Sequence, residues 1–170
     1  MIDLGVRGVS EPAETLKPAL TTYLHIAETA KTRDAGRAQF GLMFAAYLAA
    51  RTGNPELAKS ALAQVTALSR SGDYPYLSSL LVFVEAELAR ANGNAQRAIA
   101  LLKPHSDGSE YYFSHRVLMD AYATQNDYAN ALAQAQWLAQ HRGRAYAEQF
   151  GQGMLEPINV ALSDLALLDA

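Results

Sequence analysis

The sequence predicts an all-α chain in which antiparallel helix pairs follow one another, the arrangement of an α-solenoid. A short segment that ends one helix and starts the next occurs at Gly53-Asn54-Pro55, again at Gly93-Asn94-Ala95, and a third time at Asn126-Asp127-Tyr128. Glycine tolerates the left-handed conformation that ends a helix, and asparagine or aspartate caps the following one. The apolar residues between these segments recur at helical spacing. We therefore expect three helix–turn–helix units in series.

The composition fits one soluble domain and excludes several classes of function. Half of the 170 residues are hydrophobic and 18% are charged, which is ordinary for a globular protein. A net charge of -3 without a basic block gives no nucleic-acid footprint. No apolar run reaches the ~20 residues of a membrane span, and the N-terminus lacks a secretory signal. The chain has no cysteine, so disulfides and thiolate metal sites are excluded. We expect a cytoplasmic protein.

The chain divides into a leader over residues 1–9, strand-like or disordered, and a helical domain over residues 10–170. The first helix is expected from near Ser10 or Thr15 to about Lys31, with Pro18 in its first turn. Asp34 is expected to cap the next helix. The remaining helices are expected at residues 35–52, 54–69, 76–92, 95–103, 111–125, 128–142, 143–150 and 156–170, which with the first helix makes eight or nine in all, the short helix at 143–150 being the optional one.

Several single residues carry their own predictions. Ser109 is a candidate N-cap with Glu110 in the first turn of its helix, and Pro104 and Gly143 are expected to end helices. Trp137 is expected to pack the third unit against the closing helices. Arg142 and Arg144 could bind an anion, or they could donate hydrogen bonds to the last-turn carbonyls of the helix that ends near them. We favour the second role.

The second helices of the units share a small residue followed four positions later by a larger one. The pattern is Ala58-x3-Leu62 and Ala98-x3-Leu102, whereas the third unit has Ala131-x3-Ala135. An alanine at this point allows two helices to cross closely. The three alanines lie 40 and 33 residues apart. This pattern resembles the tetratricopeptide repeat, whose unit has ~34 residues.

The resemblance covers roughly residues 39–145 and implies a right-handed stack of helix pairs. The chain departs from the family pattern at three kinds of position. The tryptophan of the family is replaced by Leu42, Val82 and His115. Its glycine is replaced by Ala46, Ala86 and Met119. Its closing proline is replaced by Arg70, Glu110 and Gly143.

The leader has a resemblance of its own. Residues 4–12 resemble the last strand of class III nucleotide cyclase domains, which implies that the chain is the tail of a larger signalling protein. The match includes no catalytic position. The alternative is an N-terminus without a defined structure, and we favour that alternative.

One stripe of each first helix forms the candidate binding face. By analogy with tetratricopeptide repeats, the stripes would line a concave groove that captures a protein or peptide. The alternative, which the sequence leaves equally open, is that the aromatic residues are core. The groove residues are Phe40, Phe44, Tyr47 and Arg51 in the first unit, Phe83, Glu87 and Arg90 in the second, and Phe113, Arg116 and Asp120 in the third.

The sequence thus predicts a non-catalytic interaction module of a signalling or regulatory protein. The alternative is a helical sensor that holds a small molecule between helices. The four histidines show no metal-ligand spacing, and His115 is expected to be half-buried packing. We expect no enzyme activity, cofactor or metal, no nucleic-acid or membrane partner, and the sequence leaves a homodimer open.

Overall fold

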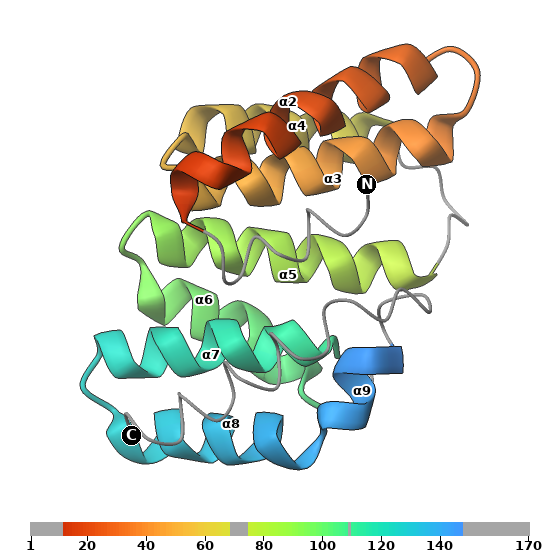
Figure 1. Ribbon diagram of the computed structural model, residues 1–170. Helices are drawn as coiled ribbons and strands as arrows, with labels where there is room; N and C mark the ends of the chain where they lie inside the picture. The colour runs from red at the N-terminus through yellow and green to blue at the C-terminus, as the bar shows by residue number, and fades with distance from the viewer. Residues whose placement is uncertain (1–11, 69–74, 109, 148–170) are drawn as a thin grey trace.

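A computed structural model describes residues 12–68, 75–108 and 110–147. Within these ranges every regular element is a helix, as the sequence predicts (Figure 1). The predicted leader over residues 1–9 and the closing helix from residue 156 lie outside the described residues. The described elements are α2 (Ala13–Ala30), α3 (Ala35–Arg51), α4 (Pro55–Leu68), α5 (Pro75–Ala91), α6 (Ala95–Leu102), the 3-10 helix η1 (Lys103–His105), α7 (Tyr112–Thr124), α8 (Tyr128–Gln140) and α9 (Arg142–Ala147).

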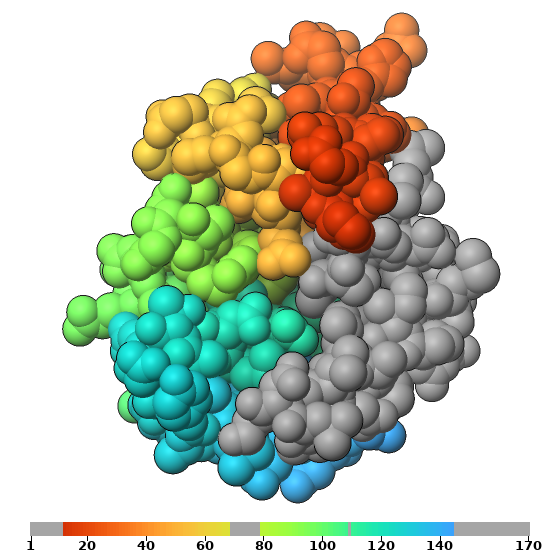
Figure 2. Space-filling model, turned by 60° about the vertical axis from the view of Figure 1, so that its left-hand side comes forward, coloured from red at the N-terminus to blue at the C-terminus, as the bar shows by residue number. Residues whose placement is uncertain are grey.

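The helices pack largely on their neighbours in sequence. α3 packs against both α2 and α4, α5 packs against α6, and α7 packs against α8. Contacts between α3 and α5, between α5 and α7 and between α6 and α7 connect these groups. In Figure 1 α3, α5 and α7 follow one another down the molecule, and in Figure 2 the coloured surface runs in chain order from α2 to α8. Chain order is therefore also spatial order.

Three turns with the same backbone geometry connect the helices of each pair. Gly53, Gly93 and Asn126 adopt φ values of 75°, 77° and 59°, the left-handed conformation expected after a helix. The N–H that follows each of them reaches back five residues to a carbonyl, at 2.8, 2.9 and 3.0 Å. This is the bond of a Schellman motif, which satisfies carbonyls at the helix end.

The same turns also start the next helix. The side chains of Asn54, Asn94 and Asp127 accept hydrogen bonds from backbone N–H groups three residues later, at 3.2, 3.0 and 3.2 Å. Asp34 caps α3 in the same way, through Arg37 N–H at 3.0 Å. The predicted stop-and-start segments are confirmed, and α3, α4, α5, α6 and α8 begin within about a residue of their predicted positions.

Three residues lie differently from their predicted positions. Pro18 is in the second turn of α2, on its exposed side, where the proline ring leaves the Glu14 carbonyl without its helical donor. Glu110 precedes α7, because its carboxylate turns back to accept from Gly108 N–H at 2.7 Å. Gly143 lies inside α9. α8 ends instead at His141, whose ring Nδ1 donates to the Trp137 carbonyl at 2.7 Å.

Alanines fill the places where the helices cross. Ala58 and Ala98 are fully buried, and Ala131 is almost so, at 4% exposure. The pattern extends to the first helices, where Ala46 and Ala86 are also fully buried. Small side chains at crossings let helix axes approach closely, so the larger residues that surround them can interdigitate.

One close approach involves glycine rather than alanine. A Cβ atom at Gly41 of α3 would lie 3.0 Å from both Tyr23 O and Ala27 N of α2. Both of these atoms belong to the backbone and cannot move away as a side chain could. α2 and α3 can therefore meet as they do because residue 41 has no side chain.

We predict that Gly41→Ala lowers the free energy of unfolding by ~1–3 kcal/mol, because the added methyl group overpacks this crossing. Gly36→Ala in the same helix is the control, since its Cβ meets only a side-chain oxygen at 3.6 Å. The control is expected to be neutral or stabilising by ~0.5–1 kcal/mol through helix propensity. Urea denaturation measures both. Equal midpoints for the two variants would contradict the close approach of α2 and α3.

A second crossing can be tested in α6. Ala98→Leu adds three carbon atoms where the side chain is fully buried, and we expect a loss of ~1–3 kcal/mol. Ala100→Leu in the same helix is the control, because Ala100 is exposed. A thermal melt of Ala98→Leu that matches the control would show that α6 does not cross its neighbours at this residue.

Candidate functional site

Charged side chains from α3, α5 and α7, the first helices of three successive pairs, gather on one face of the helical array. Arg51 ends α3, Glu87 and Arg90 lie in α5, and Arg116 and Asp120 lie in α7. We call these five residues the arginine face. Each is a residue that the sequence assigned to the groove, and the arrangement of α3, α5 and α7 brings them together.

Glu87 is the centre of the arginine face. Its side chain is only 2% exposed, and a buried carboxylate requires partners. Arg90 supplies two parallel bonds, Nε to Oε2 at 2.8 Å and Nη2 to Oε1 at 2.7 Å. Arg51 Nη1 from α3 is 3.5 Å from Oε1. The hydrogen bonds that Arg90 donates to Glu87 raise the pKa of Arg90 further, which keeps the guanidinium charged at any working pH.

An aromatic pair lies beneath these charges. Tyr47 of α3 and Phe83 of α5 are 5% and 7% exposed, and their ring centroids are 5.5 Å apart. Burial, together with the negative charge of Glu87, raises the pKa of Tyr47 well above its usual value. The tyrosine hydroxyl is therefore neutral, and the pair joins α3 to α5 below the ionic layer.

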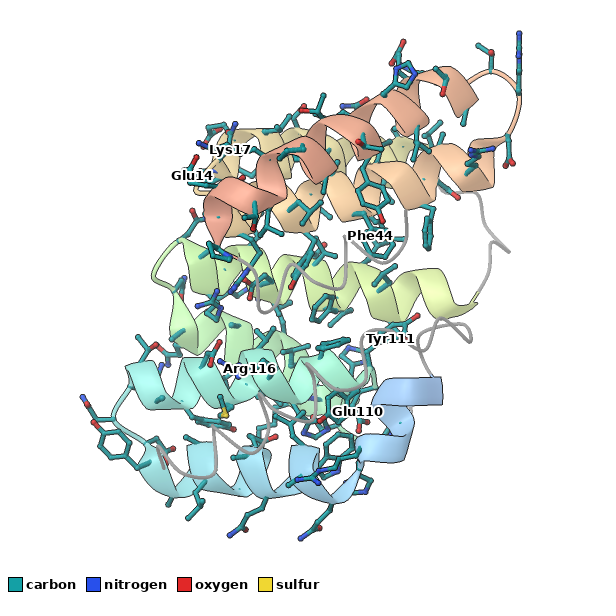
Figure 3. All side chains as sticks on the ribbon, viewed as in Figure 1. Glu14, Lys17, Phe44, Glu110, Tyr111 and Arg116 are labelled. Carbon is teal, nitrogen blue, oxygen red and sulfur yellow. The ribbon has the colours of Figure 1, made fainter. Side chains whose placement is uncertain are left out.

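The α7 part of the face is more open. Arg116 Nε and Asp120 Oδ1 are 3.2 Å apart, and each side chain is 26% exposed. The charge of Asp120 contributes to raising the pKa values of both Tyr47 and Arg90, which shows that it lies within electrostatic reach of the α3–α5 cluster. Arg116 is labelled on α7 in Figure 3.

The structure separates the predicted aromatic residues into two kinds. Tyr47 and Phe83 are core residues, whereas Phe40, Phe44 and Phe113 are half-buried. Phe44, labelled in Figure 3, stacks on Tyr23 of α2 with a centroid distance of 5.0 Å and also meets Phe40 at 4.6 Å. Phe113 meets Tyr112 edge to face at 5.6 Å. The accessible area of the predicted groove residues therefore comes from half-buried rings and from partly exposed charged side chains.

A second cluster joins α7, α8 and α9. His115 of α7 is 5% exposed, so it is more buried than the sequence indicates. Its ring stacks on Trp137 of α8 with a centroid distance of 3.4 Å, and Trp137 in turn stacks with His141 at 4.1 Å. We call these three residues the aromatic stack. The prediction that Trp137 packs against closing helices concerns residues outside the described ranges.

Polar groups enclose the aromatic stack. His115 Nε2 is 3.0 Å from Glu110 Oε1, and Nδ1 is 2.7 Å from Gln134 Oε1. Arg144 of α9 donates to the Glu110 carbonyl, lies 3.6 Å from its carboxylate, and places its guanidinium 5.5 Å from the Trp137 ring centre. These contacts hold Arg144 against Glu110, which precedes α7, and not against the last-turn carbonyls of α8 that the sequence favoured. The sequence could have indicated the contact between Trp137 and His141, because residues four apart share a helix face. It could not indicate the contact with His115, which belongs to another helix.

A cavity of about 270 Å³ lies between α2, α3 and α4. Its size is just below that of typical small-molecule sites, ~300–1,000 Å³. Five of its lining residues are apolar and three are polar: Leu24, Ala27, Ala38, Leu42 and Leu68, with Glu28, Lys31 and Gln64.

Comparison with known proteins adds no further assignment, because no protein-family model, curated protein or solved structure matches the chain. Within the described ranges, no helix combines the length and apolarity that crossing a membrane requires. The same ranges contain no group of three or more acidic, histidine or cysteine side chains placed to hold a metal ion.

The dependence of Glu87 on its arginines gives a stability prediction. We expect Arg90→Met to lower the free energy of unfolding by roughly 2–3 kcal/mol. The buried carboxylate of Glu87 would then keep only Arg51, which is the more distant of its two partners. The control is Lys59→Met, which breaks the pair with Glu56 at the same spacing of three residues. That pair is 57% and 81% exposed, so the expected change is below ~0.5 kcal/mol. Similar losses in both variants would contradict a central role for Glu87.

Proposed function

We propose that this chain is a non-catalytic interaction module, in which the face formed by α3, α5 and α7 binds an extended or helical segment of a partner protein. The observation that carries the proposal is the arginine face. Arg51, Arg90 and Arg116 come from the first helices of three successive pairs, and each is between 22% and 26% exposed. A stripe of partly exposed guanidinium groups across several helices suits an elongated partner rather than a compact ligand.

The chemistry of the face supports a protein partner. Arginine is enriched at binding hot spots because its planar group makes several directed hydrogen bonds and also packs on apolar surfaces. Glu87 and Asp120 fix the orientation of the three guanidinium groups before any partner arrives, which lowers the entropy lost on binding. The half-buried rings of Phe44 and Phe113 supply apolar area beside these charges.

We further propose that the helix pairs form a right-handed solenoid of the tetratricopeptide type. Three observations support this arrangement: the repeated turns, the buried alanines at positions 58, 98 and 131, and the succession of α3, α5 and α7. In such a stack the first helices of successive pairs share one surface, and the arginine face lies on these helices. A role in a signalling or regulatory protein of the cytoplasm completes the proposal.

Selection from a library of displayed random peptides tests the proposal, because it does not require the natural partner to be identified. Peptides enriched on the wild-type chain are measured by fluorescence anisotropy against Arg116→Ala. We expect at least ~30-fold weaker binding, corresponding to the ~2 kcal/mol of a hot-spot residue. The folding cost is expected to be small, because the Arg116–Asp120 pair is a quarter exposed.

Lys59→Ala is the matched control for this experiment, because Lys59 is an exposed cation of α4, away from the arginine face. It should leave peptide binding unchanged. Peptides that lose affinity for Lys59→Ala and keep it for Arg116→Ala would place the binding surface elsewhere. The absence of any enriched peptide would contradict the proposal as a whole.

The cavity between α2, α3 and α4 favours the second candidate, a sensor that holds a small apolar molecule. Ala38 lines the cavity and is fully buried, so Ala38→Leu would fill part of the space. If the sensor function is correct, a screen of small apolar compounds by thermal shift should find stabilisers of the wild type that fail to stabilise Ala38→Leu. Compounds that stabilise both proteins equally would contradict a site in this cavity.

A further inference from the structure

The aromatic stack lies where three helices meet, and both nitrogens of its buried histidine face oxygen atoms. His115 Nε2 is 3.0 Å from the carboxylate of Glu110, and Nδ1 is 2.7 Å from the side-chain oxygen of Gln134. A ring that carries two protons donates to both groups. A ring with one proton can keep both bonds only if the amide of Gln134 turns to present its nitrogen.

Glu110 transmits the state of this ring to α9. Its carbonyl and carboxylate both face the guanidinium of Arg144. Burial alone would raise the pKa of Glu110, but hydrogen bonds from His115 and from the backbone N–H groups of Glu110 and Gly108 outweigh it and lower the pKa. The carboxylate therefore stays charged throughout the pH range in which histidines exchange their proton.

Among the described residues, Glu110 is the acidic group in contact with the ring. On α7, Tyr112 donates from its hydroxyl group to the Leu138 carbonyl at 3.0 Å. The described residues of α8 present Gln134 and Trp137 to the ring, both neutral. His141 at the end of α8, and Arg142 and Arg144 in α9, are the basic groups of the junction. Lys103 and His105 of η1 are exposed to solvent.

We propose that the aromatic stack, with Glu110 and Arg144, is a proton-dependent latch that holds α9 against α7 most firmly when His115 carries its second proton. The protonated ring completes both hydrogen bonds and stacks as a cation on Trp137. Loss of the proton weakens the bond to Glu110, whose carboxylate is buried and needs its donors. The contact between Glu110 and Arg144 then loosens, and α9 with it.

The sign of the pH dependence follows from this arrangement. In the folded chain both ring nitrogens of His115 face oxygen atoms, and only a doubly protonated ring donates to both as they stand. We therefore expect the latch to hold most firmly at mildly acidic pH and to loosen as the pH rises. The latch does not depend on the proposed peptide binding, since its residues lie outside the arginine face.

Trp137 reports the charge of the stack directly, because the chain contains one tryptophan. We expect its fluorescence to change in one transition between about pH 5 and pH 8. Gln134→Glu places a carboxylate at Nδ1 of His115, which favours the charged ring and should move the midpoint up by about one pH unit or more. Gln134→Leu removes the acceptor and should move the midpoint down.

Gln136→Glu is the matched control, since it makes the same chemical change on the exposed side of α8. It should move the midpoint much less than Gln134→Glu does. Single substitutions distinguish the contributions of the two stacked histidines. In a His115→Gln background, Gln134→Glu should no longer move the fluorescence midpoint. In a His141→Gln background, it should still do so. If His115→Gln fails to fold, the shift in Gln134→Glu, which retains His115, still decides the question.

Hydrogen exchange then tests the mechanical part of the proposal. Amides of α9 should lose more protection between pH 6 and pH 8 than amides of α4, after correction for the intrinsic rates. Equal changes in the two helices would overturn the latch, and so would a fluorescence midpoint that Gln134→Glu leaves in place. A transition that disappears in His141→Gln and persists in His115→Gln would also overturn it.

Discussion

The structure depends on how closely its helices approach one another. At the crossings the side chains are those of alanine or glycine, and fully buried alanines occur in α3, α4, α5 and α6. Gly41 is the extreme case, since even a methyl group there would meet the backbone of α2 at 3.0 Å. Close crossings bring α3, α5 and α7 near enough for the polar ends of long side chains to meet. The ionic contacts between α3 and α5 are a consequence of this spacing.

The two polar clusters illustrate different uses of buried charge. In the arginine face, the guanidinium groups of Arg51 and Arg90 contact the buried carboxylate of Glu87. A guanidinium group stays charged at any ordinary pH. In the aromatic stack, the partner of the buried carboxylate is a histidine, a residue type that can carry a charge or be neutral. The first arrangement suits a preformed binding surface, whereas the second is the basis of the proposed latch.

The sequence was sufficient to predict the helices and turns because their signals are local. Glycine or asparagine in the left-handed position, followed by a capping side chain, determined three of the turns at Gly53, Gly93 and Asn126. Two of the wrong predictions reflect side-chain contacts that helix signals do not reveal. The carboxylate of Glu110 accepts from Gly108 N–H and contacts His115, so Glu110 stays outside α7. α8 ends before Gly143, at His141, whose ring bonds the Trp137 carbonyl of the same helix.

The candidate site shows the same limit. Helical spacing correctly placed Tyr47 and Arg51 on one stripe, and Glu87 and Arg90 on another, because a spacing of three or four residues is a property of one helix. Spacing could not tell that Tyr47, Phe83 and Glu87 lie beneath the surface, because burial depends on the helices packed alongside. The aromatic stack was missed for a related reason: His115 and Trp137 meet only when α7 and α8 are docked.

The self-contained turns have a consequence for the order in which the chain folds. Each turn is closed by hydrogen bonds that span about five residues, together with a cap three residues long, and none of these bonds requires another helix. Contacts so close in sequence form in microseconds or less. The contact between Arg51 and Glu87 instead closes a loop of 36 residues, which costs more chain entropy. We therefore expect helix hairpins to form first and the ionic contacts between them to form last, so the arginine face would mark the completion of folding.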